Sequence, residues 1–373
     1  MSPSISSSLV VWLGFVAVSR FDSVNEYFLS AAVWGAVLFS PVLGFVGLFD
    51  TAAFYLLPVQ ALLVTVEAGL HHVPSWEVVY AFAYLVAGNA VAFRWARRSF
   101  DREVVREGDP GRRLGYGSRG GAGRRRRVDA SRSPWLGLLL TDGRNWVRDP
   151  MLAFATVGPL ALATLVRVVT PTVTARLADV VDLTAYYPVV AGTMAVFGPG
   201  IFGFVVGMLV LEDRDTDVLT AYRTSPLSLR GYLAYRGSTA FLFAALSTLP
   251  SLLVVGLVGP SVPVLLETSV LAGLSGAVVG LVLGTVASDS IEGVALSKFL
   301  NLLLLGPALT VALVPEPAQL LAGVVPAYWP VKVYVAGVTD DPRTLALFVV
   351  GVGVHLLALA GVVRVLVPRL SGR

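Results

Sequence analysis

Long runs of apolar residues without a charged side chain alternate with short polar segments along most of this sequence. A helix needs about 20 apolar residues to cross a bilayer. The runs nearest to that length are residues 27–49, 151–166, 186–211, 268–288, 299–315 and 344–363. Residues 237–266 are also uncharged, but Gly259-Pro260 predicts a turn between two helices there. The pattern predicts an all-α, polytopic membrane protein.

Three shorter runs are treated separately. Residues 78–93 are followed by Arg94, Arg97 and Arg98, whose side chains can snorkel to the membrane surface and extend a spanning helix. Residues 51–66 and 317–331 contain prolines and are too short to cross comfortably. We therefore expect these last two to form re-entrant or interfacial segments. The total is about nine membrane helices plus the re-entrant segments.

Composition supports a membrane protein and excludes two other classes. The sequence is 55% hydrophobic and 14% charged, with a mean hydropathy of +0.76. A soluble domain has about 25% charged residues, and a disordered chain is far less hydrophobic. There is no cysteine, so thiolate chemistry is excluded, and there are only three histidines. We therefore expect no catalytic residue, cofactor or metal site.

Positive charge is concentrated in one segment. Residues 94–148 contain 15 of the 28 basic residues and only 6 acidic ones. The Gly- and Arg-rich residues 101–133 predict a flexible linker. Arginine beside a membrane helix marks the cytoplasmic side and contacts anionic lipid, which we favour over binding of nucleic acid. The linker and the C-terminus, with Arg364, Arg369 and Arg373, are therefore expected in the cytoplasm of a plasma-membrane protein.

Residues 134–150 are too short and too polar at their end to span the membrane. Their tryptophans and terminal basic residues predict a helix lying in the membrane interface, or else an ordinary juxtamembrane segment. The interfacial residues are Trp135, Trp146, Arg148, Asp149 and Pro150.

The loop between the second and third helices of the six-helix region carries the most specific motif. It has an acidic start, a Thr-x-x-Leu stretch and a Ser-Pro-Leu-Ser element. With Pro159 and Arg167 in the first helix of this region, it resembles ABC-2 type transporter permeases, and more weakly those of the fluoroquinolone-export type. Asp215 stands where that family often has glycine. The matching loop residues are Glu212, Thr216, Leu219, Pro226, Leu227 and Ser228.

The resemblance covers residues 134–373 and implies the transmembrane subunit of an ATP-driven exporter. In the family this loop couples the permease to a separate ATPase, so residues 212–230 are expected to contact an ATP-binding chain. Because only two lysines are present and neither lies in a Gly-x-x-x-x-Gly-Lys motif, this chain is not expected to be the ATPase. An apolar or amphipathic small molecule, drug- or lipid-like, is the expected substrate.

Two other functions stay open. An ion-coupled secondary transporter would usually place charges within the membrane and break helices in both repeats. A membrane-embedded lipid-modifying enzyme would need a cluster of acidic or histidine side chains at one interface. Few polar residues lie in the runs, and we expect Asn301 and His355 to form helix–helix hydrogen bonds, and Gly203-x-x-x-Gly207 to permit close packing or dimerisation. The substrate route is expected between two six-helix units, from a second permease or a second copy.

The N-terminal third resembles the C-terminal half of a permease. Leu13-Gly14-x-Val16-Ala17 repeats residues 283–287, while Pro58, Ala68-Gly69 and Pro74 repeat Pro326, Ala336-Gly337 and Pro342. We therefore expect a three-helix partial repeat at 1–100, the linker at 101–133, and a complete permease at 134–373. The expected origin is a truncated or split fusion whose missing half is encoded upstream or lost.

Overall fold

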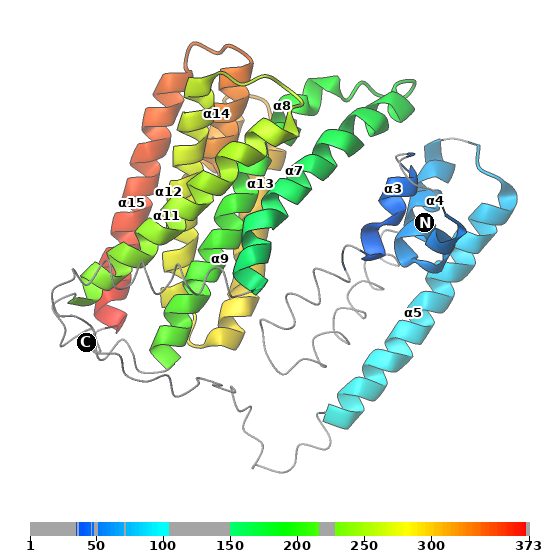
Figure 1. Cartoon of the computed structure of the whole chain (residues 1–373), viewed down its shortest axis with the longest axis horizontal. Coiled ribbons are helices and arrows are strands. Elements are labelled where there is room, and N and C mark those ends of the chain that lie inside the picture. The colour runs from blue at the N-terminus through cyan, green and yellow to red at the C-terminus, as the bar shows by residue number, and fades with distance from the viewer. Residues whose placement is uncertain are drawn as a thin grey trace. The chain divides into compact units, whose positions relative to one another are not determined.

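The computed structural model describes residues 35, 37–45, 47, 51–70, 72–103, 150–215 and 228–370, and every regular element in them is a helix. The chain divides into two compact units, Met1–Ala130 and Ser131–Arg373, each of which is described by itself (Figure 1). This agrees with the all-α class that the apolar runs predict.

The second unit is a bundle of long helices joined by short turns. Its elements are α7 (Pro150–Leu177), η2 (Thr184–Tyr186), α8 (Tyr187–Gly192), α9 (Met194–Asp215), α11 (Ser228–Val255), α12 (Val262–Val286), α13 (Ser290–Leu313), η3 (Ala318–Val324), α14 (Tyr328–Val338) and α15 (Thr344–Leu370). Six segments within the described residues are long and apolar enough to span a membrane, and all lie between Ala155 and Arg364. The expected six-helix region is therefore present.

Two predictions about helix boundaries can be compared with these elements. Gly259-Pro260 lies in the turn between α11 and α12, as expected. The run 186–211 lies within one candidate span, Thr184–Asp215, in which Thr193 forms a turn between α8 and α9. The run 317–331 forms η3 and the start of α14 rather than a spanning helix, which agrees with a non-spanning segment.

The first unit contains α3 (Pro41–Phe45), η1 (Ala52–Leu56), α4 (Pro58–Leu70) and α5 (Ser75–Glu103). The described residues of this unit add no candidate span to the six, so the expected count of nine is not confirmed. The 13-residue α4 is too short to cross a bilayer, which agrees with the non-spanning segment expected at 51–66. Residues 1–34 lie outside the described residues.

The centre of the bundle is the contact between α9 and α12, the two most buried spans. A Cβ built on Gly203 would lie 2.7 Å from Val279 of α12, and one on Gly207 would lie 2.7 Å from Leu283. Small residues let helix backbones approach closely in a membrane, where lipid is as apolar as the side chains. The Gly203-x-x-x-Gly207 motif therefore permits helix packing, as expected, and its partner is α12 of the same chain.

The α9–α12 contact predicts a specific cost for a methyl group. Gly203→Ala should lower the melting temperature of the detergent-purified protein, because overpacking a close contact costs about 1–3 kcal/mol. Gly353→Ala in α15 is the matched control, since a Cβ there meets nothing within 4 Å. Equal melting temperatures for the two variants would show that α9 and α12 are not held at this distance.

Candidate functional site

The structure describes only the two ends of the predicted coupling loop. Glu212 lies in the last turn of α9 with an exposed side chain, and Ser228 is the first residue of α11. Thr216, Leu219, Pro226 and Leu227 lie outside the described residues. So do the interfacial residues Trp135, Trp146, Arg148 and Asp149, whereas Pro150 begins α7.

A buried ion pair joins the two helices that carry the loop. Arg236 of α11 donates from Nη2 to Oδ2 of Asp213 in α9 at 2.7 Å. The Tyr232 hydroxyl donates to the same carboxylate oxygen and accepts from Nε of Arg236 at 3.1 Å. Arg236 is only 6% exposed and Tyr232 is fully buried, so this contact fixes the start of α11 against the end of α9.

Arg214, the next residue of α9, extends this contact to a third helix. Its guanidinium donates to the carbonyl oxygens of Ala287, at 3.0 Å, and Ser288, at the C-terminal end of α12. The last carbonyls of a helix have no partner within the helix, and a cation is favoured beside them. We call Asp213, Arg214, Tyr232 and Arg236 the polar anchor.

The turn after α12 is itself held by side chains. Oδ1 of Asp289 accepts from the backbone N–H of Glu292 at 2.8 Å, while Oε2 of Glu292 accepts from the N–H of Ser288 at 2.7 Å. This reciprocal capping satisfies N–H groups at the start of α13. The polar anchor and this cap together fix the ends of α9, α11, α12 and α13 at one end of the bundle.

The four anchor residues are not among the site residues that the sequence predicts. Tyr232 and Arg236 are four residues apart, the spacing that places two side chains on one helix face. Asp213 and Arg214 lie in the acidic run at the end of α9. Only the packing of α9 against α11 and α12 shows that these charges face the helices rather than the loop.

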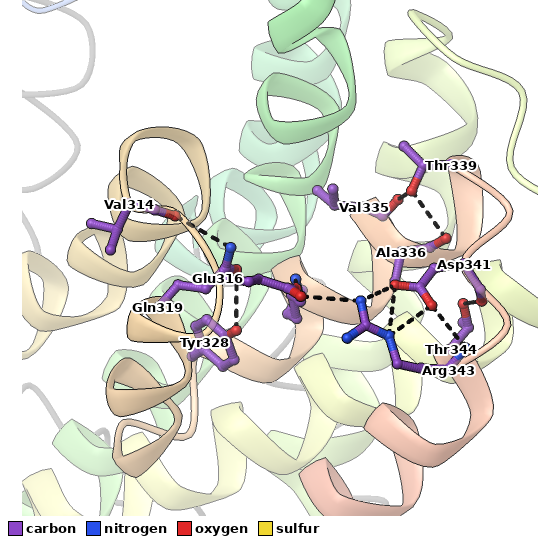
Figure 2. Close-up of polar contacts among 11 residues, drawn as sticks. Val314, Glu316, Gln319, Tyr328, Val335, Ala336, Thr339, Asp341, Arg343 and Thr344 are labelled. Carbon is purple, nitrogen blue, oxygen red and sulfur yellow. Dashed lines mark hydrogen bonds and ion pairs between the residues drawn. The ribbon is translucent and has the colours of Figure 1, made fainter.

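The opposite end of the bundle carries a second group of charges (Figure 2). Glu316, between α13 and η3, accepts from Nζ of Lys332 in α14 and, at 3.1 Å, from Nη2 of Arg343. Arg343 also pairs with Asp341 at 2.7 Å in the turn before α15. We call Glu316, Lys332, Asp341 and Arg343 the ionic cluster. It holds the α13–η3 connection against α14 and against the turn before α15.

Hydrogen bonds lower the pKa of both carboxylates in the ionic cluster. Those from Lys332 and Arg343 hold the pKa of Glu316 below its usual range. The hydrogen bonds from Arg343 lower the pKa of Asp341 to about 2. Both groups therefore stabilise the fold in the ionised form.

Two polar side chains of the spans, those of His355 and Arg167, bond to another helix. His355 of α15 lies fully buried with Nε2 2.7 Å from Oγ of Ser275 in α12, which is the expected helix–helix hydrogen bond. Arg167 of α7 donates to the carbonyl of Val254 at the end of α11 at 3.0 Å. Gly256 follows with φ +51°, and a Cβ there would collide with Arg167, so glycine is required at this helix end.

A small apolar cavity of about 60 Å³ lies between α12, α13 and the turn that joins η3 to α14. Its walls include Ser275, Leu300, Leu304 and Pro326. Oγ of Ser275 is already bonded to His355. The cavity therefore offers apolar contact rather than a set of polar ligands.

Comparison with known proteins places this bundle in a family. A model described as "Fluoroquinolones export permease protein Rv2686c-like" matches residues 142–363, more than half of the chain. The chain belongs to this Rv2686c-like family of permeases. It is therefore a membrane transport subunit rather than an enzyme.

Two relatives of Mycobacterium tuberculosis (strain ATCC 25618 / H37Rv) illustrate the match. The permease is 30% identical to "Fluoroquinolones export permease protein Rv2686c" over 225 residues, which are 59% of this chain and 88% of the relative. It is 32% identical to "Fluoroquinolones export permease protein Rv2687c" over 104 residues, 27% of this chain and 44% of that relative. No solved structure shows a significant match.

The polar anchor predicts a non-additive response to mutation. Asp213→Ala leaves Arg236 buried without its carboxylate, which costs about 3–5 kcal/mol. The double variant Asp213→Ala, Arg236→Met removes the unpaired charge and should recover part of the lost melting temperature in detergent. A double variant that melts no higher than Asp213→Ala would contradict the buried pair.

The ionic cluster predicts a pH dependence. Because the folded-state pKa values of Glu316 and Asp341 are lowered, their stabilisation is present above the ordinary carboxylate pKa of about 4 and is lost as the pH falls below it. Glu316→Gln should therefore melt lower than wild type at pH 7, and the difference should shrink at about pH 3. A difference that is independent of pH would contradict this account.

Proposed function

We propose that this permease is the transmembrane subunit of an ABC-2 type exporter, driven by a separate ATP-binding chain that pushes on residues 212–230. The observation that supports the proposal is the polar anchor at the base of this segment. An exposed loop on one freely moving helix could not transmit a displacement. Here the Asp213–Arg236 ion pair joins α9 and α11, the helices on either side of the loop. Arg214 also bonds to the carbonyl of Ala287 at the end of α12.

We infer from the chemistry of ATP binding that the energy source is a separate chain. A phosphate-binding loop needs lysine after a glycine-rich turn. Lys298 and Lys332 both lie in helices, and neither follows such a motif. The proposed arrangement therefore has the loop 212–230 and the Arg-rich linker in the cytoplasm, beside the ATPase.

We infer an apolar or amphipathic small molecule as the cargo. Two relatives bear the name of fluoroquinolone export permeases, and drug-like molecules of that kind fall within this class. We further propose that two permease units form the route, because two separate permeases of one organism are related to this chain.

Substitutions in the loop should separate ATP hydrolysis from transport. Vesicles are prepared with this permease and its ATPase, and both ATP hydrolysis and drug accumulation are measured. Glu212→Gln or Pro226→Ala should greatly reduce ATP-dependent accumulation while the amount of permease in the membrane is unchanged. Wild-type accumulation that continues without ATP but collapses with the ion gradient would instead favour the secondary transporter.

Orientation is tested with single cysteines, since the chain has none of its own. Thr220→Cys lies in the loop, and Asp340→Cys lies beside the ionic cluster at the other end of the bundle. A membrane-impermeant maleimide added to intact cells should label Asp340→Cys and should label Thr220→Cys only after permeabilisation. Labelling of Thr220→Cys in intact cells would overturn the proposed coupling site.

A further inference from the structure

Two hairpins in different parts of the chain have the same order of elements, and the lengths of the paired elements differ by two residues. In each, a 3₁₀ segment leads through an X-Pro step into a short helix, and a turn ending in proline leads into a long helix. The last residues of η1 and η3, Leu56 and Val324, are 268 positions apart. The last residues of α4 and α14, Leu70 and Val338, have the same separation.

The backbone between the 3₁₀ segment and the short helix is also the same. The Leu57 N–H donates to Phe54 O at 2.9 Å, and at the equivalent place the Val325 N–H donates to Ala322 O at 2.9 Å. Gln60 N–H to Leu57 O, at 3.1 Å, likewise corresponds to Tyr328 N–H to Val325 O, at 3.0 Å. Leu57 and Val325 both have extended backbone.

Identical residues fall at the same separation of 268. Pro58, Ala68-Gly69 and Pro74 correspond to Pro326, Ala336-Gly337 and Pro342. Apolar composition alone gives helices, but it does not fix where each begins and ends. Identical residues, helix C-termini and turn hydrogen bonds thus agree at one separation. This indicates that the two hairpins are copies of one unit; we call α4–α5 the first copy and α14–α15 the second copy.

The two copies differ in what covers them. In the α14–α15 hairpin, Gly351 and His355 of α15 are buried, and both contact α12. Their equivalents in α5 are Ala83 and Ala87, which are exposed. The same face of α5 also exposes Val79 (66%) and Val91 (64%).

A glycine in the short helix shows the same difference. A Cβ on Gly337 of α14 would lie 2.3 Å from Val264, because α12 passes directly over it. The equivalent Gly69 of α4 has nothing within 4 Å. The first copy thus has the same glycine, which supports the repeat. The offset of 270 gives Val264 no equivalent in residues 5–18, so Gly69 is not part of the docking surface proposed below.

We propose that the exposed face of α5 is a docking surface for a helix formed by residues 5–18 of this chain, in the manner of α12 on α15. These residues lie outside the described part of the structure. Leu13-Gly14-x-Val16-Ala17 repeats residues 283–287, which end α12. In this proposal the unit 1–130 contains a first copy of the C-terminal half of α12 and of the α14–α15 hairpin. No coupling residue enters this proposal, which is independent of the proposed function.

Cysteine pairs test the docking in the full-length protein in native membranes. In the second copy, Leu359 of α15 packs against the cluster that contains Leu281 of α12. The equivalent pair in the first copy is Val11 and Val91. Val11 corresponds to Leu281 by the offset of 270 that relates residues 13–17 to 283–287, and Val91 corresponds to Leu359 by the offset of 268 that relates the hairpins. After treatment with a bifunctional thiol reagent, mass spectrometry should detect linked peptides for both Val11→Cys with Val91→Cys and Leu281→Cys with Leu359→Cys.

The matched controls move one cysteine to the opposite face of the long helix. Leu357 is 75% exposed on α15, and its equivalent on α5 is Asn89. The linked peptide should be lost for Val11→Cys with Asn89→Cys and for Leu281→Cys with Leu357→Cys. The proposal is overturned if only the Leu281–Leu359 pair forms a link, which would leave the α5 face to lipid. It is equally overturned if Val11 and Val91 are linked only between two chains.

Discussion

The close approach of α9 and α12 is the constraint on which the rest of the bundle depends. Lipid gives helices no hydrophobic reason to associate, so contact between backbones must come from packing of small residues. Gly203 and Gly207 of α9 receive the side chains of α12, and Gly284 of α12 receives Val210 of α9. This reciprocal fit fixes both the distance and the register of the two helices, and the other spans pack around them.

Charged contacts hold the ends of the bundle, whereas close packing of small residues holds its middle. The charged contacts lie toward the two ends of the bundle: the polar anchor joins α9, α11 and α12, and the ionic cluster joins α14 to the turns on either side of it. Pairing at these positions avoids the cost of placing a charge in lipid, and Arg214 also satisfies carbonyls at the end of α12. The ends of the helices are therefore held by charged contacts that do not depend on the side chains facing lipid.

The sequence predicts the six spans because an uncharged run is a direct physical requirement of the membrane. It also predicts the His355 bond and the glycine packing, since a polar group or a glycine in a span has few other uses. The turn at Thr193 within the second span could not be read, because no charge or polar run interrupts the sequence there. The polar anchor was missed for a different reason: Asp213 and Arg236 belong to different helices, and only their packing pairs them.

Comparison of the two hairpins shows which interactions form the hairpin and which attach it to the rest of the bundle. Where the α14–α15 hairpin has Lys332 and Asp341, the α4–α5 hairpin has Val64 and Val73. Its 3₁₀ segment is held instead by the Tyr80 and Tyr84 hydroxyls, which donate to the carbonyls of η1. The same elements therefore form without the ions. Since Glu316 lies before η3, the ionic cluster serves to fix the end of α13 to the hairpin, and it belongs to the complete bundle rather than to the hairpin itself.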